Sequence, residues 1–207
     1  MTVQLNHPLR VAVPSDGERA ARLVLATLVV TGKVVLVYAV VRVLADPAWA
    51  NLEGKAPMAR VVMYPLWAMA VPVLWVATGR RSAFPWLADL LVTLTCLGDI
   101  VGNRLDLYNS VSWFDDAMHV LNAALVSAAF VILTVPERAS FREIVEAALA
   151  FGLTASLAWE LFEYGTFLTR STEWTTAYSD TVGDLSLGWL GSALAAVVIA
   201  VSRRHRP

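Results

Sequence analysis

Six long apolar stretches, separated by short polar segments, constrain the fold of this chain more than any other feature of its sequence. They are residues 22–44, 61–78, 84–101, 117–135, 144–161 and 182–201. About 20 apolar residues in an α-helix cross the hydrocarbon core of a bilayer. The pattern therefore predicts an all-α fold, a polytopic membrane bundle of about six transmembrane helices that forms a single membrane domain over residues 1–207.

The composition supports a bilayer environment over an aqueous one. Hydrophobic residues make up 57% of the chain and charged residues 16%, whereas soluble domains carry about 25% charged residues. A soluble helical bundle with a buried core is the alternative, and this composition disfavours it. The net charge of -1 provides no basic surface for nucleic acid. Membrane lipids are therefore the expected partners, and nucleic acid is not.

The distribution of Lys and Arg between the spans predicts their orientation. Cytoplasmic loops carry an excess of these residues. One side of the predicted bundle holds ten of them: Arg10, Arg19, Arg22, Arg80, Arg81, Arg138, Arg142, Arg203, Arg204 and Arg206. The other side holds four: Lys55, Arg60, Arg104 and Arg170. The sequence thus predicts that both termini lie in the cytoplasm (N-in/C-in).

Acidic residues gather at the end of the predicted bundle that this orientation places outside. Eight of the seventeen acids lie where the third to sixth spans meet that face: Asp99, Asp106, Asp115, Asp116, Glu160, Glu163, Asp180 and Asp184. Small residues share a helix face with acids in the fifth span (Gly152, Ser156, Glu160, Glu163) and the sixth (Asp180, Asp184, Gly188, Gly191). Since small residues allow helices to approach closely in membranes, these acids are expected to point into the bundle.

Converging carboxylates repel one another unless protons or a cation neutralise them. Oxygen donors together with an imidazole suit a divalent ion such as Mg, Mn, Ca, Fe or Zn. The predicted metal ligands are His119, Glu160, Glu163, Asp180 and Asp184. The candidate catalytic residues are Asp115, Asp116 and His119, with a carboxylate orienting the imidazole as a ligand or general base.

The third span contributes candidate substrate-binding residues at the same end. Asp99, Asn103 and Asp106 are expected to form one stripe along it. Asp99 and Asn103, with Arg104 as a partner for phosphate, are the predicted substrate-binding residues.

Simpler roles are open for some of the acids. Asp115, Asp116 and Asp180 lie just before predicted spans, where acids act as helix N-caps. Capping does not account for Glu160 and Glu163, which lie at the C-terminal end of a helix, where the dipole disfavours anions.

Two other polar residues admit structural roles. His119 on its own fits a core histidine whose hydrogen bonds are satisfied. Lys33, in the middle of the first span, needs a partner, and either Asp89 or Glu146 could supply it.

Three segments of the C-terminal half resemble elements of VanZ-like and YjdF-like bacterial membrane proteins. W-F-D-D-A-M-H-V (113–120) is similar to a D-x-x-x-H element that opens a span. W-E-L-F-E-Y-G (159–165) is similar to an E-x-x-E/Q element, and S-D-T-V-G-D-L-S-L-G-W-L-G (179–191) to a closing D-x-x-x-D/N…G-x-x-G span. The closer likeness is to the YjdF-like family. One departure is Asp116, which stands where many relatives carry Lys and so removes a positive charge from the site.

The resemblance implies a multi-pass protein of the bacterial inner (plasma) membrane, and it supports the site without supplying a reaction. The acidic cluster, with Arg104 and Arg170 nearby as possible phosphate partners, favours a divalent-metal-dependent membrane enzyme, a hydrolase or transferase, acting on a lipid or lipid-linked substrate at the outer face. A cation- or proton-coupled transporter is the alternative, and so is a structural or accessory membrane protein whose polar cluster fixes helix packing.

Reporter fusions test the predicted orientation. A reporter fused after Pro207 is expected to read as cytoplasmic, and one inserted within residues 165–179 as external, because of the ten-to-four excess of Lys and Arg. The opposite pattern would overturn both the N-in/C-in orientation and the outward position of the acidic cluster.

Overall fold

The structure, a computed structural model, describes residues 15–79, 83–166, 168 and 175–204. Its helices are α1 (Asp16–Ala45), η1 (Pro47–Ala50), α2 (Pro57–Ala68), α3 (Ala70–Ala77), α4 (Trp86–Arg104), α5 (Leu107–Ser110), α6 (Phe114–Thr134), α7 (Phe141–Thr166) and α8 (Ala177–Arg204). No strand occurs among the described residues. The predicted all-α fold of a polytopic membrane protein is confirmed.

Five helices are individually long and apolar enough to cross a bilayer, namely α1, α4, α6, α7 and α8. The sixth candidate span is the pair α2 and α3, which is bent by 41°. Pro72 follows the break and has no N–H to donate to the carbonyl of Ala68, so a helical hydrogen bond is lost where the pair bends.

The side chain of Lys33, on the neighbouring helix α1, supplies a hydrogen bond to the carbonyl that this break leaves without a helical partner. Its ammonium donates to the freed carbonyl of Ala68 and to Asp89 Oδ1, at 2.8 Å for the latter. Asp89 is thus the partner that Lys33 was expected to need, whereas Glu146 pairs with Arg142. The pair of partly buried Lys33 and buried Asp89 ties α1 to α4 across the bend.

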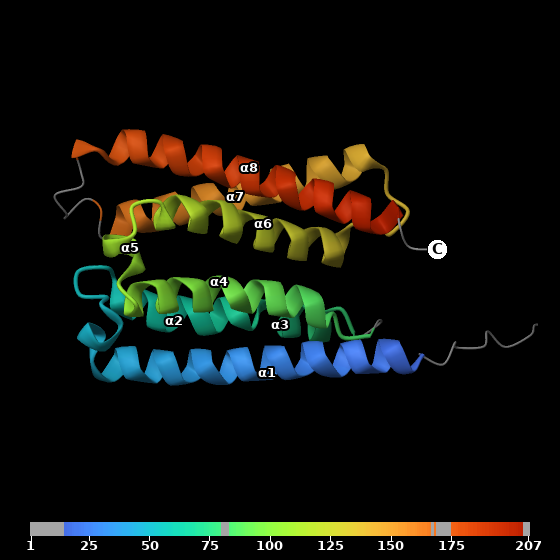
Figure 1. The fold of residues 1–207 in the computed structure, drawn as a ribbon, viewed down its shortest axis with the longest axis horizontal. Coiled ribbons are helices and arrows are strands. Elements are labelled where there is room, and N and C mark those ends of the chain that lie inside the picture. The colour runs from blue at the N-terminus through green and yellow to red at the C-terminus, as the bar shows by residue number, and fades with distance from the viewer. Residues whose placement is uncertain (1–14, 80–82, 167, 169–174, 205–207) are drawn as a thin grey trace, which may run out of the picture.

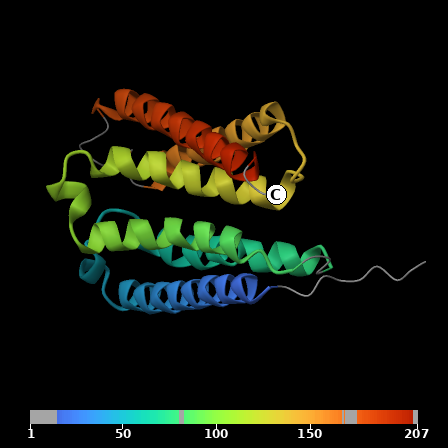
Figure 2. The same ribbon diagram turned by 45° about the vertical axis from the view of Figure 1, so that its right-hand side comes forward.

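The helices form two groups that meet along α4 and α6 (Figures 1 and 2). One group contains α1, α2, α3 and α4, and the other contains α6, α7 and α8. Large apolar side chains such as Val30, Val34 and Val37 remain exposed along α1. In a bilayer these side chains face lipid, so their exposure carries no cost there.

The chain runs up and down, so alternate helix ends meet at the same end of the bundle. The C-terminal ends of α1, α4 and α7 and the N-terminal ends of α2, α6 and α8 lie together, on the left in Figure 1. We call this end of the bundle the site end. The orientation of the site end relative to the cytoplasm stays a prediction, since several of the counted Arg residues lie outside the described ranges.

Small residues bring α6, α7 and α8 into close contact. A Cβ added to Gly188 would lie 2.3 Å from Ser156 Oγ, and one added to Gly191 would lie 2.1 Å from the carbonyl oxygen of Val120. Gly152 meets Ser192 and Ser127 in the same way. The predicted small-residue faces therefore do point into the bundle.

The contact at Gly191 generates a stability prediction. Gly191→Ala is expected to lower the free energy of unfolding by about 1–3 kcal/mol, because the new Cβ meets backbone that cannot move without separating α6 from α8. Gly183→Ala, in the same helix with nothing within 4 Å of its Cβ, is the matched control and should change little. The measurement is a thermal melt in mild detergent, and equal midpoints for the two variants would refute the packing argument.

Candidate functional site

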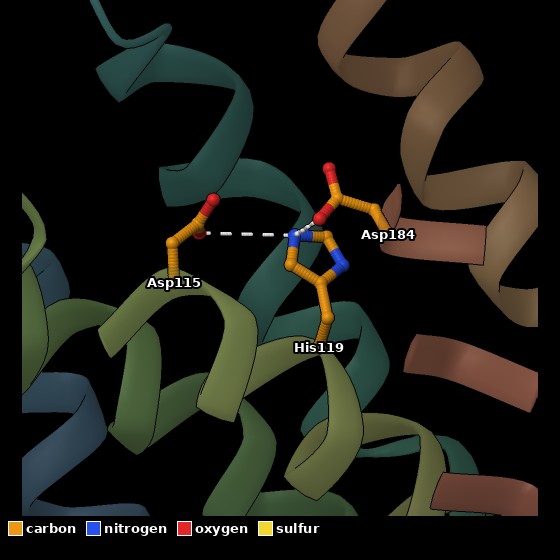
Figure 3. Close-up of side chains that lie close together, drawn as sticks. All are labelled: Asp115, His119 and Asp184. Carbon is orange, nitrogen blue, oxygen red and sulfur yellow. Dashed lines mark ion pairs between the residues drawn. The ribbon is translucent and has the colours of Figure 1, made fainter. Parts of the chain in front are cut away.

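At the site end, the His119 imidazole lies among carboxylates from three helices. Its Nε2 is 3.5 Å from Asp184 Oδ1 of α8 and 3.7 Å from Asp115 Oδ1 of α6. Figure 3 shows both carboxylates directed toward this ring nitrogen. The Nδ1 atom lies 3.9 Å from Glu160 Oε1 of α7. Each ring nitrogen therefore faces acid.

The helix packing explains why these residues meet. Ala123, Ser156 and Gly188 form one layer, in which Gly188 contacts the other two. His119, Glu160 and Asp184 are each four residues from a member of that layer, toward the site end. Because residues four apart share a helix face, the close contact at Gly188 sets the register that brings the imidazole and two acids together.

Exposure differs around the ring and defines an open side. The side chains of Glu160 and Asp184 are 7% and 6% exposed, and that of His119 is 12% exposed. Asp115 is 49% exposed. The group is therefore closed by α7 and α8 and is reached from the side of Asp115.

The separations at His119 Nε2 are longer than direct hydrogen bonds and leave room for an ion. Ligand atoms of Asp115, His119 and Asp184 all lie within 4.8 Å of one another. Ligands at roughly 2.0–2.2 Å from an ion are separated from one another by about 3.0–3.6 Å, close to the two separations at Nε2. A direct N–H···O bond is shorter, about 2.7–3.2 Å. These three residues could hold a divalent ion, with Glu160 on the far side of the imidazole.

This group differs from the predicted ligand set. Asp115, expected to be catalytic, joins His119 and Asp184, because the i, i+4 spacing on α6 places it beside Nε2. Asp180 is exposed in the first turn of α8, and Glu163 is partly buried one turn beyond Glu160. Neither belongs to the three-residue group. Their roles as ligands stay predictions.

The capping alternative does not describe α6. Its N-cap is Trp113, and no side chain caps the helix; Asp115 and Asp116 occupy its first turn. Acids there interact favourably with the helix dipole. Asp116 is exposed. Its catalytic role stays a prediction.

A second polar group lies at the site end between α2 and α4. Asp99 accepts hydrogen bonds from Arg60 Nε at 3.0 Å and from the Tyr64 hydroxyl at 2.5 Å. Asn103 Nδ2 donates to the Asp99 carbonyl at 2.9 Å, and Lys55 Nζ lies 3.4 Å from Asn103 Oδ1. Asp99 and Asn103, predicted to bind substrate, are thus bonded to protein groups. Their substrate role stays a prediction.

Sequence reasoning missed Arg60 and Tyr64 as parts of this group. It counted Arg60 as a loop residue, because the predicted second span began at residue 61, whereas α2 begins at Pro57. The available signal was the i, i+4 spacing of Arg60 and Tyr64 at the start of a span, opposite a span that carries an acid.

The expected stripe of Asp99, Asn103 and Asp106 is wrong in its last member. Helix α4 ends at Arg104, and Asp106 has a positive φ of 59° before α5. Its side chain accepts hydrogen bonds from Asn51 and Asn109, both at 2.6 Å.

The two polar groups lie next to each other at the site end. The Arg60 guanidinium carbon is 5.9 Å from the Trp159 ring, next in sequence to Glu160. Tyr108 of α5 feels the charges of both Asp99 and Asp115, and burial, with a smaller contribution from these charges, raises the pKa of its phenol well above the ordinary value. Tyr108 therefore remains a neutral O–H group.

The remaining predicted residue of this region, Arg104, is exposed and lies over the Trp49 ring at 5.3 Å. Arg170 lies outside the described residues. A buried acceptor that was not assigned a role is Asn122 Oδ1, three residues after His119, which has no hydrogen-bond partner among the described residues.

Searches among curated proteins and among solved structures found no match. A protein-family model with the description "Predicted membrane protein (DUF2238)" matches residues 23–205. That description supports a membrane protein and does not name the VanZ-like or YjdF-like groups. Since the match covers most of the chain and agrees with its membrane-spanning helices, the protein belongs to this membrane protein family.

Proposed function

We propose that the protein binds a divalent metal ion between Asp115, His119 and Asp184 and acts as a metal-dependent hydrolase or transferase on a lipid or lipid-linked substrate. The observation that carries the proposal is the position of His119 Nε2, 3.5 and 3.7 Å from two carboxylates. Both separations suit two ligands of one ion. The group lies at the site end, where lipid headgroups are within reach of it.

The charge balance supports a bound cation. Asp115 and Asp184, the two carboxylates beside His119 Nε2, lie near Asp116 and Asp180, which makes a group of four acids in addition to Glu160 at Nδ1. Among the described residues, no Lys or Arg forms an ion pair with any of the four. Asp89 and Asp99, by contrast, each pair with a cation. A dication would supply the positive charge that the group around His119 lacks.

The residues present suit a catalytic type of metal site. Three protein ligands leave coordination positions open for water or substrate, and a histidine with two carboxylates favours Zn, Mn or Fe over Ca. A bound ion supplies Lewis acidity for hydrolysis or group transfer. Glu160 would hold the His119 ring by accepting from Nδ1–H, as carboxylates beside metal-bound histidines do. Asp116, exposed at the open side, is the proposed proton acceptor.

Cationic groups at the same end suit a substrate with a phosphate. The hydrogen bonds from Lys55 Nζ are long, 3.4 Å to Asn103 and 3.5 Å to Asn109, and the ammonium lies 5.8 Å from the Tyr108 ring centroid, so a phosphate could displace the two amides. Arg104 is exposed at the end of α4. Both would bind the phosphate of a lipid-linked substrate, while Asp115 faces the open side of the site.

We also propose that the protein is related to the VanZ-like and YjdF-like proteins. On this proposal it lies in the bacterial inner membrane, with the site end facing outward. The transport alternative draws on Lys33 and Asp89, which are charged and lie deep in the bundle. These two side chains neutralise each other, and Lys33 also donates to the Ala68 carbonyl at the bend between α2 and α3, so a structural role accounts for them.

Metal removal tests the proposal. A divalent ion is expected to raise the thermal midpoint of the chelator-treated protein, because it binds the folded state alone; at a hundredfold excess over Kd the gain is about 2.7 kcal/mol. Asp184→Asn and His119→Ala should abolish the shift. Glu53→Gln, which removes an exposed acid at the same end, is the control and should keep it. An unchanged midpoint with Mg, Mn, Ca, Fe and Zn, in a sample that purifies without metal, would contradict the proposal.

Substitutions at two glutamates on α7 distinguish the observed group from the predicted ligand set. Glu160→Gln is expected to weaken metal binding about 10–100-fold without abolishing it, because Glu160 holds the imidazole from its Nδ1 side. Glu163→Gln, one turn away, should have a smaller effect. Isothermal titration with Mn or Zn gives both affinities. If Glu163→Gln lost metal binding and Asp115→Asn kept it, the predicted ligand set would be favoured instead.

A further inference from the structure

A cavity of about 170 Å³ lies at the opposite end of the bundle from His119. It is formed by the connection between α6 and α7, the first residues of α7 and the last turn of α8. Sites for organic cofactors enclose roughly 300–1,000 Å³, so this cavity suits a single small headgroup. Its lining includes Glu137, Arg138, Phe141, Ile144, Arg203 and Arg204.

One of the three arginines builds the wall of the cavity. Arg203 donates from Nη1 to the Pro136 carbonyl at 2.8 Å and from Nη2 to the Val135 carbonyl at 3.0 Å. Its Nε lies 3.4 Å from Glu137 Oε2. Arg203 therefore satisfies carbonyls at the end of α6 and neutralises the one acid of the lining.

The other two arginines are available to a ligand. Arg138 and Arg204 are exposed, and among the described residues neither forms an ion pair. Three arginines less one glutamate give the lining a charge of +2. The cavity thus presents two uncompensated guanidinium groups, which suit a phosphate because they form paired N–H···O bonds.

The cavity is apolar on another side. Ile144 and Ala200 are buried beneath it, and Phe141 is 50% exposed at the start of α7. The cavity lies where α6, α7 and α8 have ends, which is where membrane-spanning helices meet the bilayer interface. Arginine beside apolar surface at that depth matches a molecule with a charged phosphate and a hydrocarbon part, which is the chemistry of a phospholipid.

We propose that this cavity binds the phosphate of an anionic phospholipid headgroup through Arg138 and Arg204, with Phe141 against its glycerol and acyl carbons. The lipid is a resident of the opposite leaflet from the metal group and is no substrate of it. The inference therefore stands independently of the proposed function.

A lipid titration tests the inference. The protein in mild detergent with chelator is titrated with phosphatidylglycerol, phosphatidylcholine or inorganic phosphate, while the thermal midpoint is followed. Phosphatidylglycerol is expected to raise the midpoint, and the other two are not. Arg138→Gln and Arg204→Gln should each weaken the apparent affinity about fivefold. Arg142→Gln is the matched control, because this exposed arginine pairs with Glu146 and does not line the cavity.

Each alternative outcome overturns the inference. An equal shift with phosphatidylcholine would mean that the headgroup charge is not recognised. An equal shift with inorganic phosphate would make the ligand a free anion. Equal losses in Arg142→Gln and the two cavity variants would reduce the effect to general surface charge. Arg138→Lys adds a further check, since it keeps the charge but not the paired hydrogen bonds, and should bind less tightly than the parent.

Discussion

The close approach of α6, α7 and α8 is the constraint on which the site depends. In lipid, helices gain little from burying apolar side chains against one another, so tight packing of small residues holds them together. Because Gly188 has no side chain, Ser156 packs against it, and because Gly191 has none, the backbone at Val120 packs against it. One turn farther toward the site end, the same register brings His119, Glu160 and Asp184 together. Larger residues at either glycine would separate the acids from the imidazole.

The buried acids fall into two kinds, and the proposed function rests on the difference between them. Asp89 and Asp99 each have a cationic partner from a neighbouring helix, Lys33 and Arg60. Such pairs compensate each other and tie α1 and α2 to α4. Among the described residues, Asp184 has an ion pair only with the imidazole of His119 and otherwise lies near other acids. Because a buried charge without a partner is costly, the first kind fits a structural role, whereas the second fits a site that takes up a cation.

The sequence was sufficient for the fold and for the neighbourhood of the site, but not for its composition. Long apolar runs indicate spans because a helix needs about 20 apolar residues to cross a bilayer. Helical spacing placed Glu160 and Asp184 on inward faces. Spacing within one helix does not give the rotation and depth of its neighbours, so it does not show that Asp115, His119 and Asp184 come within 4.8 Å of one another. The Arg60–Asp99 pair was missed because it depends on where α2 begins. The bend at Pro72 gave Lys33 a second acceptor that spacing does not predict.

The most direct test of the metal site is the location of the ion. Crystals or frozen samples of the protein prepared with Mn or Zn would be measured at the metal's absorption edge. The account predicts an anomalous peak about 2.0–2.2 Å from His119 Nε2 and from a carboxylate oxygen of both Asp115 and Asp184, with Glu160 hydrogen-bonded to Nδ1. An ion bound elsewhere, or His119 Nε2 hydrogen-bonded directly to one of the two carboxylates in metal-replete protein, would contradict it.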